Sequence, residues 1–276
     1  MKLSHRHPLL YKMAVFYHRN KRRLKQRVDQ EIYVSPTTHK SSPLPHNVKR
    51  HSSRLLKKLG ETEMWLQHNK VKNLKICVPL LNGLIIRPGE SFSFCRIIGK
   101  PTRKRGFVEG VELSMGKARP GVGGGICQIA NMLHWLVLHS PLTVVERSTH
   151  SFDPFPDENR SIPFGTGCAV FYNYVDFCFK NETSYSFHLS LKLDDNNLHG
   201  HLTSDQMIEH SYKVFEKDHR FVQRADTVYR ENEIWRHVRT RLIGDPVEDQ
   251  FIKKNCVRVL YHPDPKLIFQ DSEQLG

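Results

Sequence analysis

The amino-acid sequence predicts an α+β fold: one compact domain with a buried central helix against an antiparallel sheet, plus a basic N-terminal helical arm. Helix-like segments cluster in the first half of the chain, and strand-like segments dominate after residue 162, which is typical of this class. The segment 126–139 has the length of a helix and is apolar on most sides. Such a helix is normally buried inside a domain.

Apolar residues recur at roughly helical spacing within residues 1–30, which predicts a helix there. Residues 35–53 are rich in Ser, Pro, Thr and His, which predicts a linker or exposed loop. We therefore expect three parts: a basic arm and linker over 1–53, a core domain over 54–185, and a strand-rich C-terminal extension over 186–276.

Within the expected core, spaced leucines predict a helix over 54–67, and a second helix is expected over 70–81. Strands are expected where apolar and β-branched residues alternate or cluster, over 90–96, 111–117, 142–146, 169–179 and 186–193. The last two of these strands are expected to be neighbours, and residues 194–197 form a turn before a return strand.

Positive charge is concentrated at the N-terminus. The first 60 residues contain 15 lysines and arginines against two acidic residues, whereas the other 216 contain 27 against 26. Such an arm suits an anionic membrane surface, and nucleic acid is a less expected partner. Positive charge alone does not identify the partner. A third interpretation is a solvated basic helix that packs on the body through its apolar face.

Hydropathy and cysteine usage indicate the compartment. No stretch of about 18 apolar residues is present, so no transmembrane helix is expected, and the N-terminus has no signal-peptide pattern. The six cysteines are scattered without a Cys-x-x-Cys pair. This pattern is more typical of a cytosolic protein with reduced thiols than of a disulfide-bonded one. We expect a cytoplasmic protein that is peripheral at the inner membrane face.

A glycine-rich loop, Gly121-Val-Gly-Gly-Gly125, precedes Cys127 at the start of the expected 126–139 helix. Partial positive charge at a helix N-terminus favours a thiolate, so Cys127 is the candidate nucleophile. The amide of Gln128 and the backbone N–H groups of Gly123, Gly124 and Gly125 could stabilise an oxyanion.

Thiol catalysis also requires a base and a group that orients the base. His150, which follows a predicted strand, is the candidate base, and Asp176 or Asn181 is the candidate orienting group. Asn131 and His134 share a helical stripe with Cys127. Asn131 is therefore a further candidate for ligand binding. Glu90, which follows Pro88-Gly89, is another candidate as a pocket carboxylate.

Each candidate also has a structural interpretation. Cys127 could be a small buried residue, and the glycines could serve close packing or a tight turn. His150 and Asp176 could be hydrogen-bonded structural residues, and Glu90 could close the turn after Pro88-Gly89. Zinc bound by Cys127, His134 and His150 is disfavoured because no His-x-x-x-His pair lies beside a glutamate. No metal and no cofactor are expected.

Several motifs resemble those of the VanW family over about residues 60–185. They are Arg87-Pro-Gly-Glu-Ser-Phe-Ser-Phe94, Gly99 with Gly106-Phe107, Gly123-Gly-Gly-Ile-Cys-Gln128, Glu146-Arg147 through His150-Ser151, and Val175-Asp-Phe-Cys-Phe-Lys-Asn181. The resemblance implies a link to glycopeptide (vancomycin) resistance or cell-envelope metabolism. Many family members carry Asp-Ala-Thr-Val where this chain has Gly167-Cys-Ala-Val170, so the aspartate is replaced here.

Two functional hypotheses follow. In the first, the chain is a cysteine-dependent enzyme for acyl transfer or hydrolysis of a cell-wall precursor or related peptide. In the second, it is a non-catalytic accessory or binding protein at the cytoplasmic membrane surface, attracted there by its basic arm. The sequence does not indicate an oligomeric state.

Overall fold

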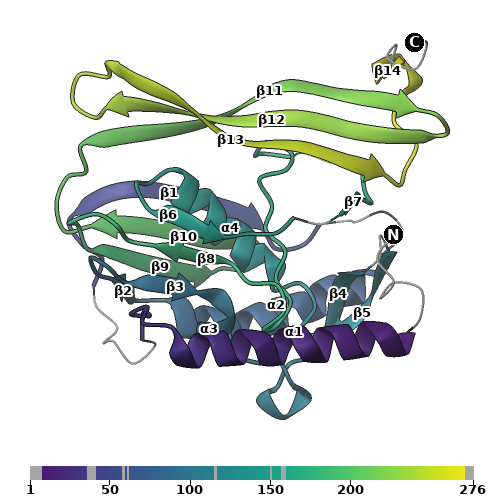
Figure 1. Cartoon of the computed structure of the whole chain (residues 1–276), viewed down its shortest axis with the longest axis horizontal. Helices are drawn as coiled ribbons and strands as arrows, with labels where there is room; N and C mark the ends of the chain where they lie inside the picture. The colour runs from purple at the N-terminus through teal and green to yellow at the C-terminus, as the bar shows by residue number, and fades with distance from the viewer. Residues whose placement is uncertain are drawn as a thin grey trace.

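Four α-helices and mainly antiparallel sheets make up the part of the chain that the structure describes, residues 8–35, 42–57, 60, 62–114, 117–149, 151–156 and 160–270 (Figure 1). The structure is a computed structural model. The predicted α+β class is confirmed. No helix in these described ranges is long and apolar enough to cross a membrane.

The central sheet has the strand order β1-β10-β9-β2, and every pair in it is antiparallel. Its strands are β1 (His46–Arg54), β10 (Asn197–Ser204), β9 (Phe187–Leu193) and β2 (Leu84–Ile86). Segments from all three of the expected parts of the chain therefore meet in one sheet.

Two longer helices pack with this sheet. Helix α4 (Cys127–Leu138) contacts β1 and β10, and nine of its residues are buried. Gly200 of β10 lets Met132 and Leu136 approach, because an added Cβ there would meet both side chains. Helix α2 (Met64–Leu81) contacts β9 and β4 (Glu109–Ser114), which forms a hairpin with β5 (Lys117–Val122).

A small sheet of order β3-β8-β6 adjoins the same core. Its strands are β3 (Ser91–Ser93), β8 (Cys178–Lys180) and β6 (Thr143–Glu146). The short helix α3 (Phe94–Ile98) follows β3 directly, and a 3-10 turn covers Arg103–Arg105. Phe92 of β3 stacks on its cross-strand partner Phe179 of β8, with ring centroids 4.6 Å apart, and both rings belong to the hydrophobic core.

The strands after residue 209, together with β7, form a separate layer. Its sheet has the order β14-β11-β12-β13-β7 and lies on the side of the molecule opposite α1 (Figure 1). The strands are β11 (His210–Arg224), β12 (Thr227–Thr240), β13 (Pro246–Val259), β14 (Ile268–Gln270) and β7 (Phe152–Asp153). A buried ion pair between Arg230 of β12 and Asp153 of β7, 3.2 Å apart, lies within this sheet.

Four expectations for local structure are wrong in whole or in part. The strand expected over 90–96 ends at Ser93, because helix α3 begins at Phe94. The helix expected over 54–67 is not formed: β1 ends at Arg54, and the single helix α2 begins only at Met64. The expected linker over 35–53 contains most of β1, while residues 36–41 lie outside the described residues. Most of 169–179 is irregular, and β8 pairs with β3 and β6 rather than with β9. For β1 and β8, pairing with distant strands overrides local preference.

Candidate functional site

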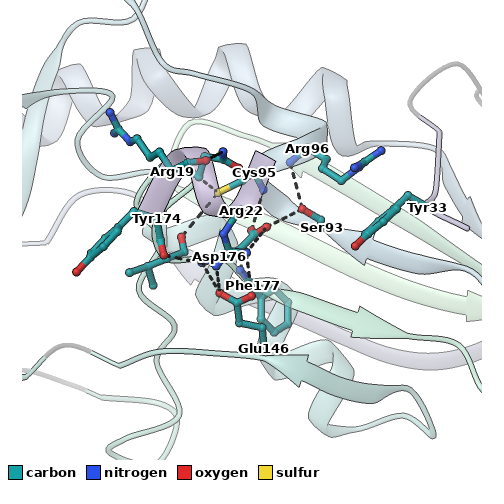
Figure 2. A network of polar contacts seen from close by, with 12 residues as sticks. Arg19, Arg22, Tyr33, Ser93, Cys95, Arg96, Glu146, Tyr174, Asp176 and Phe177 are labelled. Carbon is teal, nitrogen blue, oxygen red and sulfur yellow. Dashed lines mark hydrogen bonds and ion pairs between the residues drawn. The ribbon is translucent and has the colours of Figure 1, made fainter. Parts of the chain in front are cut away.

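Asp176 is the centre of a buried polar network that joins three of the sequence motifs (Figure 2). Its carboxylate is fully buried and accepts hydrogen bonds from Ser93 Oγ at 2.6 Å and from the backbone N–H groups of Cys95 and Phe177 at 2.8 Å each. Three donors of this kind satisfy most of the acceptor capacity of a carboxylate. The network therefore accommodates the charge of Asp176 away from water.

A cation from α1 (Pro8–Val28) completes the network. Arg22 donates from Nη1 to Glu146 Oε2 at 2.8 Å and from Nη2 to Glu146 Oε1, and its Nη1 lies 3.7 Å from Asp176 Oδ2. The hydrogen bond to Glu146 is the main cause that raises the pKa of Arg22 above its ordinary value. This paired geometry is the strong form of an arginine–carboxylate contact. It ties α1 to β6 and to the segment before β8.

A second set of contacts holds α1 against the body at Arg19, about one helical turn before Arg22. Arg19 Nε donates to the carbonyl of Tyr172 at 3.0 Å, and Asn173 Nδ2 donates to the carbonyl of Arg19 at 3.0 Å. The Arg19 guanidinium also lies 5.0 Å from the ring centroid of Phe171. Polar contacts thus fix the side of α1 that faces the body.

The opposite side of α1 is apolar and exposed. Met13, Phe16, Tyr17, Leu24 and Val28 are 60–80% exposed, and they recur at the spacing of one helix face. The interpretation that the helix packs on the body through its apolar face is therefore wrong. We call these five side chains the outward stripe.

Basic residues border the outward stripe. Lys21 and Arg23 are exposed and occupy the positions to either side of it on the helix. Met13, Phe16, Tyr17 and Asn20 also line a shallow, open depression on this face. The helix thus presents an apolar surface with cationic edges.

Cys127 is the first residue of α4, as expected, but its surroundings differ from those of an activated thiol. It is partly buried, and its Sγ donates to the carbonyl of Val170 at 3.7 Å. Burial raises the pKa of Cys127, which is opposite to the direction expected from its position at a helix N-terminus. Desolvation is the largest cause of the raised pKa and outweighs the lowering by the backbone hydrogen bonds of the thiol.

The other members of the expected catalytic set are not shown together. His150 lies outside the described residues. Asp176 is bound to Ser93, Cys95 and Phe177, as described above, and Asn181 Nδ2 donates to the carbonyls of Ile86 and Tyr185. The assignment of a base to Cys127 stays a prediction.

The glycine loop is closely packed. An added Cβ at Gly124 would overlap the carbonyl of Gly110, and one at Gly125 would overlap the side chain of Lys70. Gly123 has a φ of 82° and lies against Pro101. Close packing, which is the structural interpretation of these glycines, therefore accounts for them.

The polar candidates beside this loop make structural hydrogen bonds. Gln128 Nε2 donates to Ser53 Oγ at 3.0 Å and to the carbonyl of Arg54 at 2.8 Å. Asn131 Oδ1 accepts from the backbone N–H of Cys168 at 2.5 Å.

Glu90 and His134 are likewise held by local contacts. Glu90 Oε2 accepts from the backbone N–H of Arg87 at 2.7 Å, which closes the turn. His134 Nδ1 bonds the carbonyl of Thr166 at 2.8 Å, and burial lowers the pKa of His134 to about 3. Within the described ranges no cluster of three metal-ligating side chains occurs.

Sequence reasoning did not assign the partners Arg22, Glu146 and Ser93 to Asp176. Ser93, Glu146 and Asp176 all lie in the motifs that resemble the VanW family. The motifs therefore indicated three of the four residues, while the pairing with Arg22 required the placement of α1.

Comparisons with known proteins agree with the motifs. The family model described as VanW like protein matches residues 69–203. The chain is 29% identical over 212 residues to vancomycin B-type resistance protein VanW of Enterococcus faecalis. This match covers 77% of each of the two chains. It is 30% identical over 113 residues to uncharacterized protein YoaR of Bacillus subtilis. This match covers 40% of this chain and 35% of that protein. No solved structure matches the chain.

Proposed function

Because the chain belongs to the VanW family, we propose that it is an accessory protein of glycopeptide resistance or cell-envelope metabolism that acts at an anionic membrane surface without catalysis of its own. We place it on the cytoplasmic side as a peripheral protein, because all six cysteines are free, as is usual in a reducing compartment. The relative in Enterococcus faecalis carries vancomycin resistance in its name, and that link motivates the envelope context.

The observation that carries the proposal is the outward stripe of α1. Phe16 is 69% exposed and Val28 80%, although helices on soluble surfaces normally direct such side chains inward. Full burial of one large apolar side chain contributes about 1.5–3 kcal/mol. Partial burial of five of them in the headgroup region therefore supports reversible binding.

Charge favours an anionic bilayer over a second copy of this chain. Lys21 and Arg23 border the stripe, and basic residues outnumber acidic ones 15 to 2 in the first 60 residues. Each lysine or arginine near an anionic leaflet contributes about 1 kcal/mol. Two such helices facing each other would instead repel.

Vesicle flotation tests the proposal. The full chain is mixed with vesicles of phosphatidylcholine with or without 30% phosphatidylglycerol, a proportion chosen to give roughly the surface charge of a bacterial leaflet. We expect flotation with the anionic vesicles and at least tenfold weaker binding for the double variant Phe16→Ser with Leu24→Ser. The matched control is Leu242→Ser with Ile243→Ser, which replaces two residues that are 79% and 74% exposed on the other layer.

Two outcomes would overturn the proposal. One is equal flotation of the wild type and the α1 double variant. The other is a dimer in solution that the α1 variant dissociates while neither protein floats, since the stripe would then bind a second copy.

Thiol chemistry is a second candidate function, motivated by the position of Cys127 at the first turn of α4. In it, Cys127 is the nucleophile, His150 the base and Asp176 the orienting group, with Gln128 at the oxyanion. The raised pKa of Cys127 and the existing bonds of Asp176 count against this candidate.

A further inference from the structure

A serine, a histidine and an aspartate form a chain of hydrogen bonds across β1 and β10 of the central sheet. Ser52 Oγ lies 2.7 Å from Nδ1 of His199, and Nε2 of the same ring lies 2.5 Å from Asp194 Oδ2. Ser52 is exposed, and the side chains of His199 and Asp194 are 39% and 45% exposed, so solutes reach all three groups. A hydroxyl, a base and an acid in this order form the arrangement that activates a serine as a nucleophile.

The carboxylate determines which ring nitrogen of His199 carries the hydrogen. The hydrogen bond with His199 is the largest cause that lowers the pKa of Asp194 to about 2, so Asp194 is ionised near neutral pH. An ionised carboxylate only accepts hydrogen bonds, so Nε2 of the neutral ring bears the hydrogen and Nδ1 bears the lone pair. The Ser52 hydroxyl therefore donates to Nδ1, which is the direction required for removal of its proton. The two nitrogens have exchanged the roles that they have in serine proteases, but each partner of the hydroxyl and of the acid is the same.

The backbone positions both ends of this chain of bonds. Asp194 Oδ1 accepts from the backbone N–H groups of Asn196 at 2.8 Å and Asn197 at 2.6 Å, which fixes the carboxylate in the turn between β9 and β10. Ser52 and His199 lie directly opposite each other in the paired strands. The three groups are therefore held in place by the fold itself, as a reactive site requires.

The backbone N–H of Ser52 points to the open edge of the sheet. Strand β1 is the terminal strand of the sheet, and Leu55 N donates inward to the carbonyl of Asn196, whereas Gln128 reaches the carbonyl of Arg54 from outside. Successive residues of an antiparallel strand alternate in direction, so Ser52 points outward as Arg54 does. This N–H can donate to the oxygen of a carbonyl group that Ser52 Oγ attacks.

Cationic side chains border the hydroxyl. Arg50 and Arg54 lie two residues before and after Ser52, and alternate residues of a strand share one face. Lys192 of β9 lies opposite His199 and is exposed. These charges favour the negative charge that develops on the attacked oxygen.

We propose that Ser52 is an acylation site, at which the hydroxyl attacks an activated acyl donor such as an aryl ester or a thioester. The bond between Ser52 Oγ and the carbonyl carbon forms, and the bond from that carbon to the leaving oxygen or sulfur breaks. The hydroxyl proton passes to Nδ1 of His199 and from there to the leaving group. The products are an ester on Ser52 and a free alcohol or thiol. One modification per chain involves no turnover, so the inference goes beyond the membrane function and does not depend on it.

Acetylation of the full chain by p-nitrophenyl acetate near neutral pH tests the inference. Samples are quenched with acid at intervals, and peptide mass spectrometry measures acetylation at each serine. Ser190 is the internal comparison, because its Oγ lies 3.2 Å from Nδ1 of His188, a longer contact than that of Ser52. We expect Ser52 to be acetylated about tenfold faster than Ser190, or more, because a positioned base accelerates the attack.

Variants show whether the rate depends on the histidine and the acid. We expect His199→Ala to slow acetylation of Ser52 about tenfold or more, and added imidazole to restore part of the rate. Asp194→Asn keeps an oxygen for the turn and should slow acetylation severalfold in the wild-type background. It should have no further effect in His199→Ala, because Asp194 acts through the ring. Ser190→Ala is the matched control and should leave Ser52 unaffected, and thermal unfolding checks that every variant is folded.

Fast acetylation of Ser52 that requires His199 and is rescued by imidazole would support the inference. Acetylation of Ser52 no faster than that of Ser190 would overturn it, and so would an undiminished rate in folded His199→Ala. Neither result would affect vesicle flotation, so failure here and failure of the membrane proposal are distinguishable.

Discussion

Arg22 of α1 and Glu146 of β6 form a two-bond ion pair although 124 residues separate them in the sequence. The pair lies directly beside the fully buried carboxylate of Asp176. It determines which side of α1 faces the body, and therefore which side remains exposed. The orientation of the outward stripe thus follows from this polar contact together with the burial of Val15 on the same side of the helix.

Replacement of Arg22 tests this relationship. We expect Arg22→Met to lower the free energy of unfolding by about 1.5–3 kcal/mol, because Glu146 loses its charged donor and Asp176 loses its nearby cation. Urea unfolding measures the change. Arg23→Met, at an exposed neighbouring position, should stay within about 0.5 kcal/mol of the wild type. Equal stabilities of the two variants would contradict the assignment.

The packing of the glycine loop predicts a steric effect. Gly124→Ala would place a methyl group against the carbonyl of Gly110, and we expect a loss of about 1–3 kcal/mol in unfolding free energy. Gly167→Ala is the control, because the nearest atom to its added Cβ is Asn131 Oδ1 at 3.5 Å, an ordinary contact. A harmless Gly124→Ala would show that the loop is more open than described.

Two buried histidines predict acid sensitivity. Burial lowers the pKa of His139 to about 4 and that of His134 to about 3. Between the ordinary histidine value near 6.5 and these values, the unfolded chain binds protons that the folded chain does not. Their contribution to stability is therefore complete above pH 6.5 and is lost as the pH falls through about 4 for His139 and about 3 for His134.

Comparing the pH dependence of the unfolding free energy between the wild type and a histidine variant separates this effect from the titration of carboxylates. His139→Gln should make the unfolding free energy less dependent on pH between about 6.5 and 4, whereas His68→Gln, on an exposed part of α2, should leave the profile unchanged. Superimposable profiles for the wild type and His139→Gln would contradict the burial of His139.

Thiol labelling tests the second candidate function. With iodoacetamide near neutral pH, we expect the exposed Cys256 to react at least tenfold faster than Cys127, because burial keeps the Cys127 thiol protonated. Peptide mass spectrometry measures both rates. Preferential labelling of Cys127 that falls in His150→Ala would instead support the nucleophile–base pair.

The sequence predicts elements whose residues carry a strong local signal. The helix predicted from the apolar segment 126–139 is α4 (Cys127–Leu138), and the helix predicted from the spacing within 1–30 is α1 (Pro8–Val28). Periodicity shows that a helix has an apolar face, but whether that face is buried depends on the partner. Arg22 lies in a basic run and has no distinctive spacing, so its pairing with Glu146 is not readable from the chain.

Strand β1 and the site show the same limit. The sequence of β1, His-Asn-Val-Lys-Arg-His-Ser-Ser-Arg, is polar because it is an edge strand with a single buried residue, Val48. Its partner strand β10 lies about 150 residues away in the sequence, so the pairing leaves no pattern in the residues of β1 themselves. The motif containing Asp176 was recognisable, but its hydrogen bonds to Ser93 and Cys95 depend on the packing of β3 against β8.

The central claim is that the outward stripe of α1 enters a bilayer, and fluorescence quenching by bromine on lipid acyl chains tests it most directly. The variant Phe16→Trp is compared with the wild type, whose own tryptophans provide the background. We expect the additional emission to shift to shorter wavelength and to be quenched in anionic vesicles. Additional emission that stays at its wavelength in water and is not quenched would contradict the account.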